Sequence, residues 1–169
     1  MKHDIILVDE RDNQIGTGEK LAVHKTGKLH RCFSIFIFNA RGDMLLQKRA
    51  VRKYHSGGLW TNTCCGHPKP GEETAQAAHK RLQEEMGFDC ALREVFTFTY
   101  KKAFTNGLTE HEFDHVFIGM YNNKPTLNPE EADAWRWLSP DELKKDVERY
   151  PEQYTYWFSI ALKKVLATT

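Results

Sequence analysis

Thr61-Asn62-Thr63-Cys64-Cys65-Gly66-His67-Pro68 is the part of the sequence that restricts the architecture most, because it joins an extended segment to a helix. Residues 59–65 are predicted to be extended. Helical periodicity then runs from residue 71 to 86, with one apolar stripe made of Ala75, Ala78, Leu82 and Met86. Gly87 follows at the position of a C-terminal cap. A strand that leads into an amphipathic helix predicts a sheet with a helix packed on one face.

The segments on either side of this unit supply the other strands of the predicted sheet. His30 to Asn39 carries apolar side chains at both alternating sets of positions, which indicates a strand buried on both faces. Residues 39–43 are a predicted hairpin loop that leads to a partner strand at residues 44–47. Further strands are predicted at residues 5–8 (resuming at Ile15), 95–101, 110–121 and 134–138, with a polar stretch at 16–28 and a loop at 50–58.

Two helices are predicted near the end of the chain. Ser139-Pro140-Asp141-Glu142 has the residues of a capping box with proline at the first helical position. Residues 152–166 have the pattern of an amphipathic helix. With 169 residues and no repeat or linker, the chain is expected to form a single domain over residues 1–169, an α/β sandwich with helices packed on a sheet.

The bulk composition excludes several classes of protein. A formal net charge of +1 gives no overall field that would favour nucleic acid or a membrane surface, and no apolar run is long enough to span a bilayer. Four cysteines, two of them adjacent, do not resemble a secreted disulfide framework. The first residues have too short an apolar run and too much acidic charge for a signal peptide, so a cytoplasmic location is expected.

Alternation along two predicted strands sorts the reactive side chains. Cys65 and His67 are two residues apart, so in an extended segment they point in one direction and Cys64 points in the other. Glu110 and Glu112 share a direction in the same way, opposite to that of the histidine between them. A thiol that faces a carboxylate across a cavity is an acid/base pair.

Three histidines and the two glutamates could form one metal site. His24, His30, His67, Glu110 and Glu112 would supply five N/O ligands, which suits octahedral Mn²⁺ or Mg²⁺, with Zn²⁺ competing on intrinsic affinity. The residue pattern alone leaves this site and an unrelated set of histidines as equal alternatives. The remaining histidines are expected to be surface or satisfied core residues: His3, His55, His79, His111 and His115. A structural zinc module built on Cys64, Cys65 and His67 is disfavoured, since no second cysteine pair lies at the required spacing.

These motifs together resemble type 1 isopentenyl-diphosphate isomerases, a branch of the Nudix fold. The resemblance rests on Glu19-Lys20-x-x-x-His24, Leu29-His30, the run from Trp60 to Pro68, and Glu110-x-Glu112. It implies a Nudix-like α/β/α sandwich with a mixed sheet, and the Nudix signature falls on Gly66, Glu72, Leu82, Glu84, Glu85, Gly87 and Phe88. One departure is Lys80-Arg81, where Nudix hydrolases carry Arg-Glu; a guanidinium there would bind phosphate instead of helping to hold a hydrolytic metal.

The resemblance also implies roles for individual residues. Glu112 would be the acid, assisted by the Tyr100 hydroxyl, and Cys65 would handle the proton on the opposite face of the substrate. Trp157 would face the carbocation, although on the sequence alone core packing of its amphipathic helix is the favoured explanation of a tryptophan there. Positions that would contact the diphosphate are Lys20, Arg49, Lys53 and Arg81. Glu85 would hold a second Mg²⁺ on the phosphate oxygens, although Arg81 and Glu85 are also spaced as an ordinary helical ion pair.

The expected partner is therefore a small molecule, isopentenyl or dimethylallyl diphosphate, with no nucleic acid and no membrane. A monomer or weak homodimer is expected. The alternative function is a Nudix-type diphosphate hydrolase, which would keep the carboxylate at position 81 and would not need Cys65. Cys64 is expected to be a buried small hydrophobic residue on the reverse face of the strand.

Overall fold

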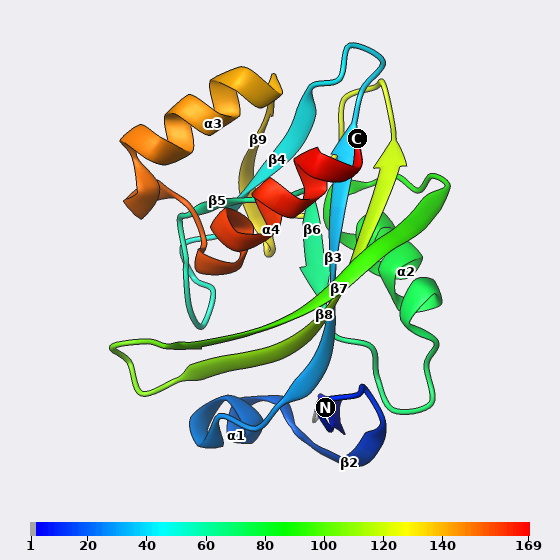
Figure 1. Cartoon of the computed structure of the whole chain (residues 1–169), viewed down its shortest axis with the longest axis vertical. Coiled ribbons are helices and arrows are strands. Elements are labelled where there is room, and N and C mark those ends of the chain that lie inside the picture. The colour runs from blue at the N-terminus through cyan, green and yellow to red at the C-terminus, as the bar shows by residue number, and fades with distance from the viewer. Residues whose placement is uncertain (1–2) are drawn as a thin grey trace.

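The computed structural model describes residues 3–169, in which four α-helices surround a single mixed sheet (Figure 1). The strands are β1 (Asp4–Val8), β2 (Gln14–Glu19), β3 (His30–Phe38), β4 (Met44–Arg49), β5 (Trp60–Thr61), β6 (Cys64–Gly66), β7 (Leu92–Ala103), β8 (Thr109–Met120) and β9 (Ala132–Leu138). The helices are α1 (Lys20–Thr26), α2 (Thr74–Met86), α3 (Pro140–Arg149), α4 (Tyr156–Thr168) and a 3₁₀ turn at Pro151–Gln153.

Strand β3 is the centre of the sheet. It pairs in parallel with β8 over its whole length and antiparallel with β6, β1 and β4. Strand β8 then pairs antiparallel with β7, and β4 pairs antiparallel with β5 and β9. The apolar residues of β3 at both sets of alternating positions are buried, which confirms the prediction of a strand covered on both faces.

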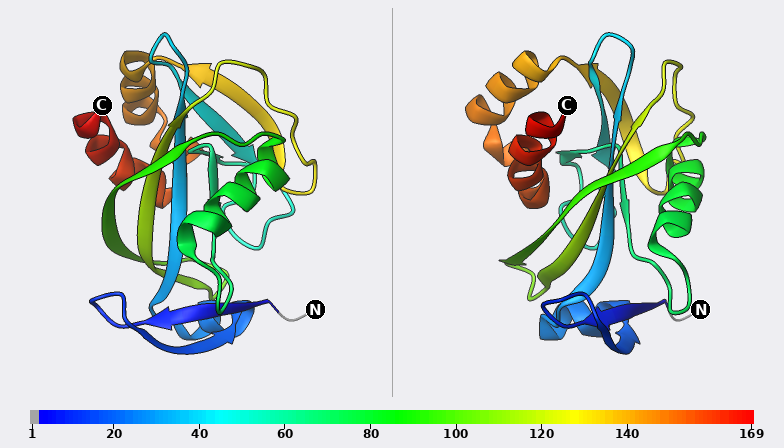
Figure 2. Two further views of the ribbon diagram at one scale, coloured as in Figure 1. Left: turned by 90° about the vertical axis from the view of Figure 1, so that its right-hand side faces the viewer. Right: turned by 45° about the vertical axis from the view of Figure 1, so that its right-hand side comes forward.

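Helices cover both faces of the sheet, so the predicted α/β/α sandwich is confirmed. Figure 2 shows α2 on one face and the pair α3 and α4 on the other, with the segment that contains β1, β2 and α1 across one end. Phe33, Ile35 and Ile37 of β3 pack with α2, whereas Phe36 and Phe38 pack with α4. These two apolar layers fix the sheet between the helices and leave its end near β1 for polar residues.

The prediction of a polar stretch at residues 16–28 missed the regular structure within it. Strand β2 continues to Glu19, and α1 follows it directly. The Glu19 carboxylate caps this helix by accepting the N–H groups of Leu21 and Ala22 at 3.1 and 2.9 Å, and Gly27 ends it in the left-handed region. A seven-residue helix capped by glutamate has little periodicity and lacks the usual Ser, Thr, Asp or Asn signal.

The extended segment predicted at residues 59–65 is divided into β5 and β6. Asn62 interrupts it, because its side-chain amide donates to the carbonyls of Ile35 and Cys64 at 3.1 and 2.9 Å. The last helix begins later than predicted, at Tyr156. Thr155 remains extended, since its N–H donates to the Trp60 carbonyl and its hydroxyl contacts that of Thr61.

Helix α2 carries the buried stripe predicted for it, with one change. Ala78, Leu82 and Met86 are buried as expected, but Ala77 lies in the stripe and Ala75 is exposed. The helix begins at Thr74 instead of Gly71, and Gly87 caps it in the left-handed region as predicted. No helix within residues 3–169 has both the length and the apolar character needed to cross a membrane.

Replacing Gly87 with alanine is expected to destabilise the protein more than replacing Gly71. Both glycines have positive φ, 74° and 82°, so each alanine incurs about 1–2 kcal/mol of backbone strain. At Gly87 the added Cβ would also lie 2.6 Å from the Thr126 carbonyl oxygen, whereas at Gly71 nothing lies within 4 Å. Urea unfolding should show a further loss of about 1–3 kcal/mol for Gly87→Ala. Equal losses would contradict the close packing of residues 126–128 on this helix end.

Candidate active site

A cavity of about 410 Å³ opens at the polar end of the sheet. Its walls come from β3, β6, β7 and β8, from α2 and α4, and from the loop at residues 50–58. Every residue to which the sequence assigned a catalytic or diphosphate-binding role lines it, together with three of the five expected metal ligands and Glu85: Cys65, Tyr100, Glu112, Trp157, Lys20, Arg49, Lys53, Arg81, His67, Glu110 and Glu85. His24 and His30 lie behind this wall and are fully buried.

Strand β8 presents three carboxylates to the cavity side of the sheet, because Glu110, Glu112 and Asp114 alternate along it. All three side chains are buried. The parallel register with β3 sets His30 opposite Glu112, and the register with β7 sets Tyr100 opposite Glu112 on its other side. The sequence identified two of these carboxylates; the same alternation could have identified Asp114.

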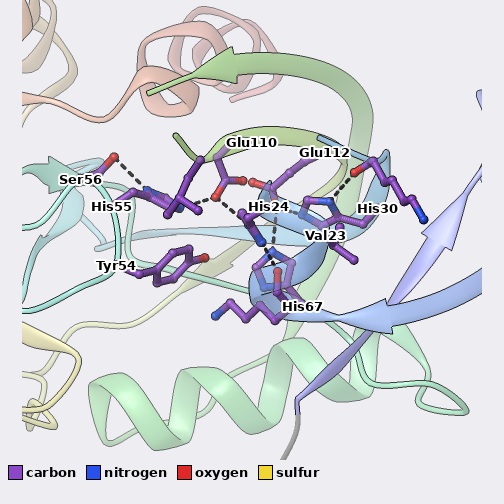
Figure 3. Close-up of polar contacts among 12 residues, drawn as sticks. Val23, His24, His30, Tyr54, His55, Ser56, His67, Glu110 and Glu112 are labelled. Atoms are coloured by element: carbon purple, nitrogen blue, oxygen red, sulfur yellow. Dashed lines mark hydrogen bonds and ion pairs between the residues drawn. The ribbon is translucent and has the colours of Figure 1, made fainter. Parts of the chain in front are cut away.

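Three histidines converge on Glu110 and Glu112, as Figure 3 shows. His24 comes from α1, His30 begins β3 and His67 follows β6. Ligand atoms of the three histidines and Glu110 all lie within 4.8 Å of one another. Glu112 Oε2 completes the group, at 2.9 Å from His67 Nε2 and 3.4 Å from His30 Nε2. The five predicted ligands are therefore gathered in one place.

The hydrogen bonds of two histidines are those expected of ligands to a cation. Nδ1 of His24 lies 2.6 Å from the Lys20 carbonyl and Nδ1 of His30 lies 2.9 Å from the Lys28 carbonyl. A carbonyl oxygen only accepts, so each Nδ1 carries the proton, and in the neutral ring Nε2 presents a lone pair. That lone pair of His24 faces Glu110 Oε1 at 3.0 Å, and His30 Nε2 and Glu110 Oε2 have no hydrogen-bond partner among the described residues. Lone pairs that converge beside carboxylates form a set of donors that a divalent cation would fit.

With only protein groups around them, Glu110 and Glu112 differ in pKa. Burial and the neighbouring Glu112 charge raise the pKa of Glu110 to about 8. Burial also acts to raise the pKa of Glu112, but its contacts with Glu110, His30 and His67 outweigh burial and hold that pKa well below its usual range. One carboxyl of the pair therefore holds a proton more readily than the other, as expected for two like charges in a shared site.

Tyr100 contacts Glu112 directly. Its hydroxyl donates to Glu112 Oε1, and burial together with the Glu112 charge raises the pKa of the phenol well above its usual value. The hydroxyl therefore remains protonated beside the carboxylate. It completes a chain of groups that can hold or move a proton at the cavity wall.

The prediction that Cys65 and Cys64 point in opposite directions is confirmed. Cys65 lines the cavity, with its sulfur 3.3 Å from Asn62 Oδ1 and 3.6 Å from Ser34 Oγ. Burial and the charge of Asp114 raise the pKa of the Cys65 thiol to about 12. Asp114 is held in turn by the Ser34 hydroxyl at 2.6 Å.

Cys64 packs among the apolar residues beneath α2, as expected, but it is not merely a small hydrophobic residue. Its thiol donates to Glu85 Oε2 at 2.7 Å. Because Arg81 Nη2 lies 2.7 Å from the other oxygen, the Glu85 carboxylate is held from two sides. Its pKa is raised, chiefly by burial.

Asn62 links the Cys65 thiol to the Trp157 ring, and no role is predicted for this residue from the sequence. Its amide nitrogen is bound to two backbone carbonyls, which leaves Oδ1 to accept from other side chains. That oxygen accepts from Cys65 and, at 3.2 Å, from the Trp157 indole N–H. Trp157 is therefore fixed against the cavity as well as packed in the core beside Tyr100.

Four cations of the cavity wall lie where the sequence predicted diphosphate contacts. The Arg49 guanidinium lies 5.3 Å from the Trp157 ring, and the Lys20 ammonium lies 4.6 Å from the Tyr54 ring. Lys53 and Arg81 are paired with acidic residues of the same wall. Burial and the charge of Lys53 lower the pKa of Lys20, as expected for cations gathered around one pocket.

His55 is expected from the sequence to be a surface or satisfied core residue, and it is buried. Its Nε2 contacts Glu110 Oε1, however, so the side chain lies beside the cluster (Figure 3). It stacks on Phe104, whose ring lies 4.9 Å away on the turn between β7 and β8. A loop residue of this kind has no periodicity from which its direction could be predicted. His79, His111 and His115 have other partners: Asp89, the Gly27 carbonyl, and the pair Asp12 and Glu94, respectively.

Comparison with known proteins gives both a domain family and close relatives. Residues 28–158 match the NUDIX domain family. Isopentenyl-diphosphate Delta-isomerase 2 from Aromatoleum aromaticum is 52% identical over 167 residues, which cover 99% of this chain and 88% of that protein. Isopentenyl-diphosphate Delta-isomerase from Serratia proteamaculans is 52% identical, with 96% and 91% of the two chains covered.

Solved structures agree on the fold. The MutT NUDIX hydrolase from Burkholderia pseudomallei superimposes with a TM-score of 0.64 at 23% identity, covering 82% of this chain and 98% of the other. The NUDIX hydrolase from Nitrosomonas europaea gives a TM-score of 0.61 at 21% identity, covering 83% and 90%. At this level of identity the likeness concerns the arrangement of strands and helices.

Replacing His30 with alanine is expected to remove bound metal from the cluster. The change deletes one Nε2 donor and leaves Glu110 and Glu112 less well neutralised, so metal affinity should fall at least tenfold, within the range of about 10–100-fold seen for ligand-supporting groups. Elemental analysis of protein dialysed against limiting Mn²⁺ measures this directly. His79→Ala, which removes an exposed histidine paired with Asp89, is the matched control. Full metal content in His30→Ala would remove this histidine from the ligand set.

Proposed function

We propose, starting from the fact that this chain belongs to the isopentenyl-diphosphate Delta-isomerase family of NUDIX-fold proteins, that it interconverts isopentenyl diphosphate and dimethylallyl diphosphate. The reaction moves a C=C bond by adding a proton at one carbon and removing another two carbons away. One observation carries the proposal. The Cys65 thiol and the Tyr100–Glu112 pair line a single cavity whose wall also carries an indole and several cations.

Protonation of the alkene is the difficult step, because it creates a tertiary carbocation. The Glu112 carboxyl or the Tyr100 hydroxyl delivers the proton to the terminal CH₂ carbon, and the electron pair of the double bond forms the new C–H bond. The Trp157 ring faces the resulting positive charge, and a desolvated cation over an indole gains about 2 kcal/mol or more. Burial of the cavity wall keeps water from capturing the cation.

Loss of a proton from the neighbouring CH₂ group completes the reaction. The Cys65 sulfur accepts this proton as a thiolate, and the C–H electron pair becomes the new double bond. In the reverse direction the same sulfur is the donor, which suits the thiol form favoured by its raised pKa. Asn62 holds the sulfur and the indole by one oxygen atom, which supports a fixed distance between the base and the cation-facing ring.

The cations of the wall bind the diphosphate. Lys20, Arg49, Lys53 and Arg81 supply N–H donors to phosphate oxygens, and the planar guanidinium groups suit bidentate contacts. Glu85 would hold the Mg²⁺ that accompanies the diphosphate. The cluster of His24, His30, His67, Glu110 and Glu112 would hold Mg²⁺ or Mn²⁺, with Zn²⁺ as a competitor, and the ion would supply positive charge beside the two buried carboxyl groups.

Diphosphate hydrolysis is the second candidate, because the fold is shared with NUDIX hydrolases. Arg81 argues against it. Its guanidinium stands where the hydrolase pattern has a carboxylate, and it pairs with Glu84 and Glu85 at 2.8 and 2.7 Å, so the carboxylates left on this helix are already partly neutralised. A hydrolytic metal group needs those carboxylates free. We infer that the protein acts in the cytoplasm on this small-molecule substrate as a monomer or weak homodimer.

Incubation of the purified protein with isopentenyl diphosphate and Mg²⁺ tests the proposal. The expected product is dimethylallyl diphosphate, with no release of phosphate or pyrophosphate. Cys65→Ala should lose turnover by a factor of at least about 10³, since the reaction lacks one of its two proton-transfer groups. Cys64→Ala removes the neighbouring thiol on the reverse face and should lose far less turnover, because that thiol reaches the site only through its hydrogen bond to Glu85.

Chromatography identifies the products, and circular dichroism shows whether both variants are folded. Equal loss in two well-folded variants would reject the assignment of Cys65. Release of phosphate by the wild type would favour the hydrolase.

A further inference from the structure

The Glu131 carboxylate is paired with two of the cations that the proposed function assigns to the diphosphate, Lys53 and Arg81. Its Oε2 lies 2.6 Å from Lys53 Nζ, and its Oε1 lies 3.3 Å from Arg81 Nη2. The Lys53 and Glu131 side chains are only 19% and 20% exposed, so water screens this pairing less than it screens a surface ion pair. All three residues line the cavity.

The backbone fixes Glu131 at this point of the wall. Its carbonyl accepts the N–H of Ala50, the first residue of the loop that carries Lys53, and its own N–H donates to the Asn128 carbonyl. Residues 126 and 128 are bonded in turn to the end of α2, which carries Arg81. The carboxylate therefore remains within reach of both cations, and only its side-chain torsions can take it away from them.

A carboxylate and a phosphate compete for the same donors. Both present oxygen pairs that match a guanidinium or an ammonium, and a donor N–H that is bonded to Glu131 is not available to a phosphate oxygen. Arg81 is already shared with Glu84 and Glu85, so Glu131 adds a third acidic partner to it. Binding of a diphosphate at Lys53 and Arg81 must displace or crowd this carboxylate.

We propose that Glu131 is a resident anion that holds Lys53 and Arg81 in the absence of diphosphate, is displaced by the diphosphate of the substrate, and thereby weakens diphosphate binding and hastens product release. This inference rests on the proposed function. Substrate and product of the isomerisation carry the same diphosphate, so binding it very tightly would favour neither and would slow departure of the product. A competing carboxylate keeps Lys53 and Arg81 in position while limiting the affinity.

Calorimetric titration with inorganic pyrophosphate tests the proposal without turnover. Glu131→Gln keeps the size of the side chain and removes its charge, and it is expected to bind pyrophosphate on the order of tenfold more tightly than the wild type, both with Mg²⁺ and with EDTA. Glu130→Gln removes the same charge from the adjacent, exposed residue and should bind like the wild type. In turnover, Glu131→Gln should show a lower KM, and a lower kcat where product release limits the rate.

Unchanged or weaker pyrophosphate binding by Glu131→Gln would overturn the proposal, and weakening confined to Mg²⁺ would make Glu131 a metal ligand instead. An equal gain in Glu130→Gln would also overturn it, since the effect would then be one of overall charge. Thermal unfolding with and without pyrophosphate shows whether each variant is folded. If Glu131→Gln binds pyrophosphate more tightly but the wild type does not isomerise its substrate, the resident anion stands and the proposed function fails.

Discussion

Two buried glutamates on one face of β8 are the constraint on which the rest of the site depends. Glu110 and Glu112 are too close and too far from water to be charged together without compensation, and Asp114 continues the same row. Histidines from three separate segments contact these glutamates. The parallel pairing of β3 with β8 sets one of them, His30, opposite Glu112. The short helix α1 contributes to the same arrangement, because it places His24 beside Glu110.

The thiol and the aromatic ring of the cavity are positioned by a second, smaller set of contacts. Asn62 breaks an extended segment into two strands because its amide is bonded to backbone carbonyls, and its oxygen then holds both the Cys65 thiol and the Trp157 indole. The fold thus separates two tasks around one cavity. Strand β8 carries the buried carboxylates that the histidines face, while the β5–β6 break and α4 place a thiol beside an aromatic ring. The cations on α2 and on the loop at residues 50–58 face the same opening.

Much of this was predictable from periodicity. Alternation in β3, β6 and β8 placed the apolar layers, separated Cys65 from Cys64 and joined Glu110 to Glu112, because side-chain direction in a strand follows from sequence spacing alone. Residues outside regular elements were not predictable in this way. His55 reaches Glu110 from a loop, and Glu131 reaches Lys53 and Arg81 from the segment before β9. Helix α1 was missed because it is short, and Thr155 was wrongly included in the last helix because its contacts with Trp60 and Thr61 are tertiary.

We propose that His24, His30, His67, Glu110 and Glu112 form one cation site whose charge permits the two glutamates to share a buried face. Anomalous diffraction from crystals soaked in Mn²⁺ tests it most directly. A strong anomalous peak is expected within coordination distance of the three Nε2 atoms and of oxygens from both carboxylates. A cluster without a peak, in crystals that show Mn²⁺ elsewhere and a hydrogen bond between Glu110 and Glu112, would contradict the proposal, because a shared proton would then compensate the two carboxylates in place of a metal.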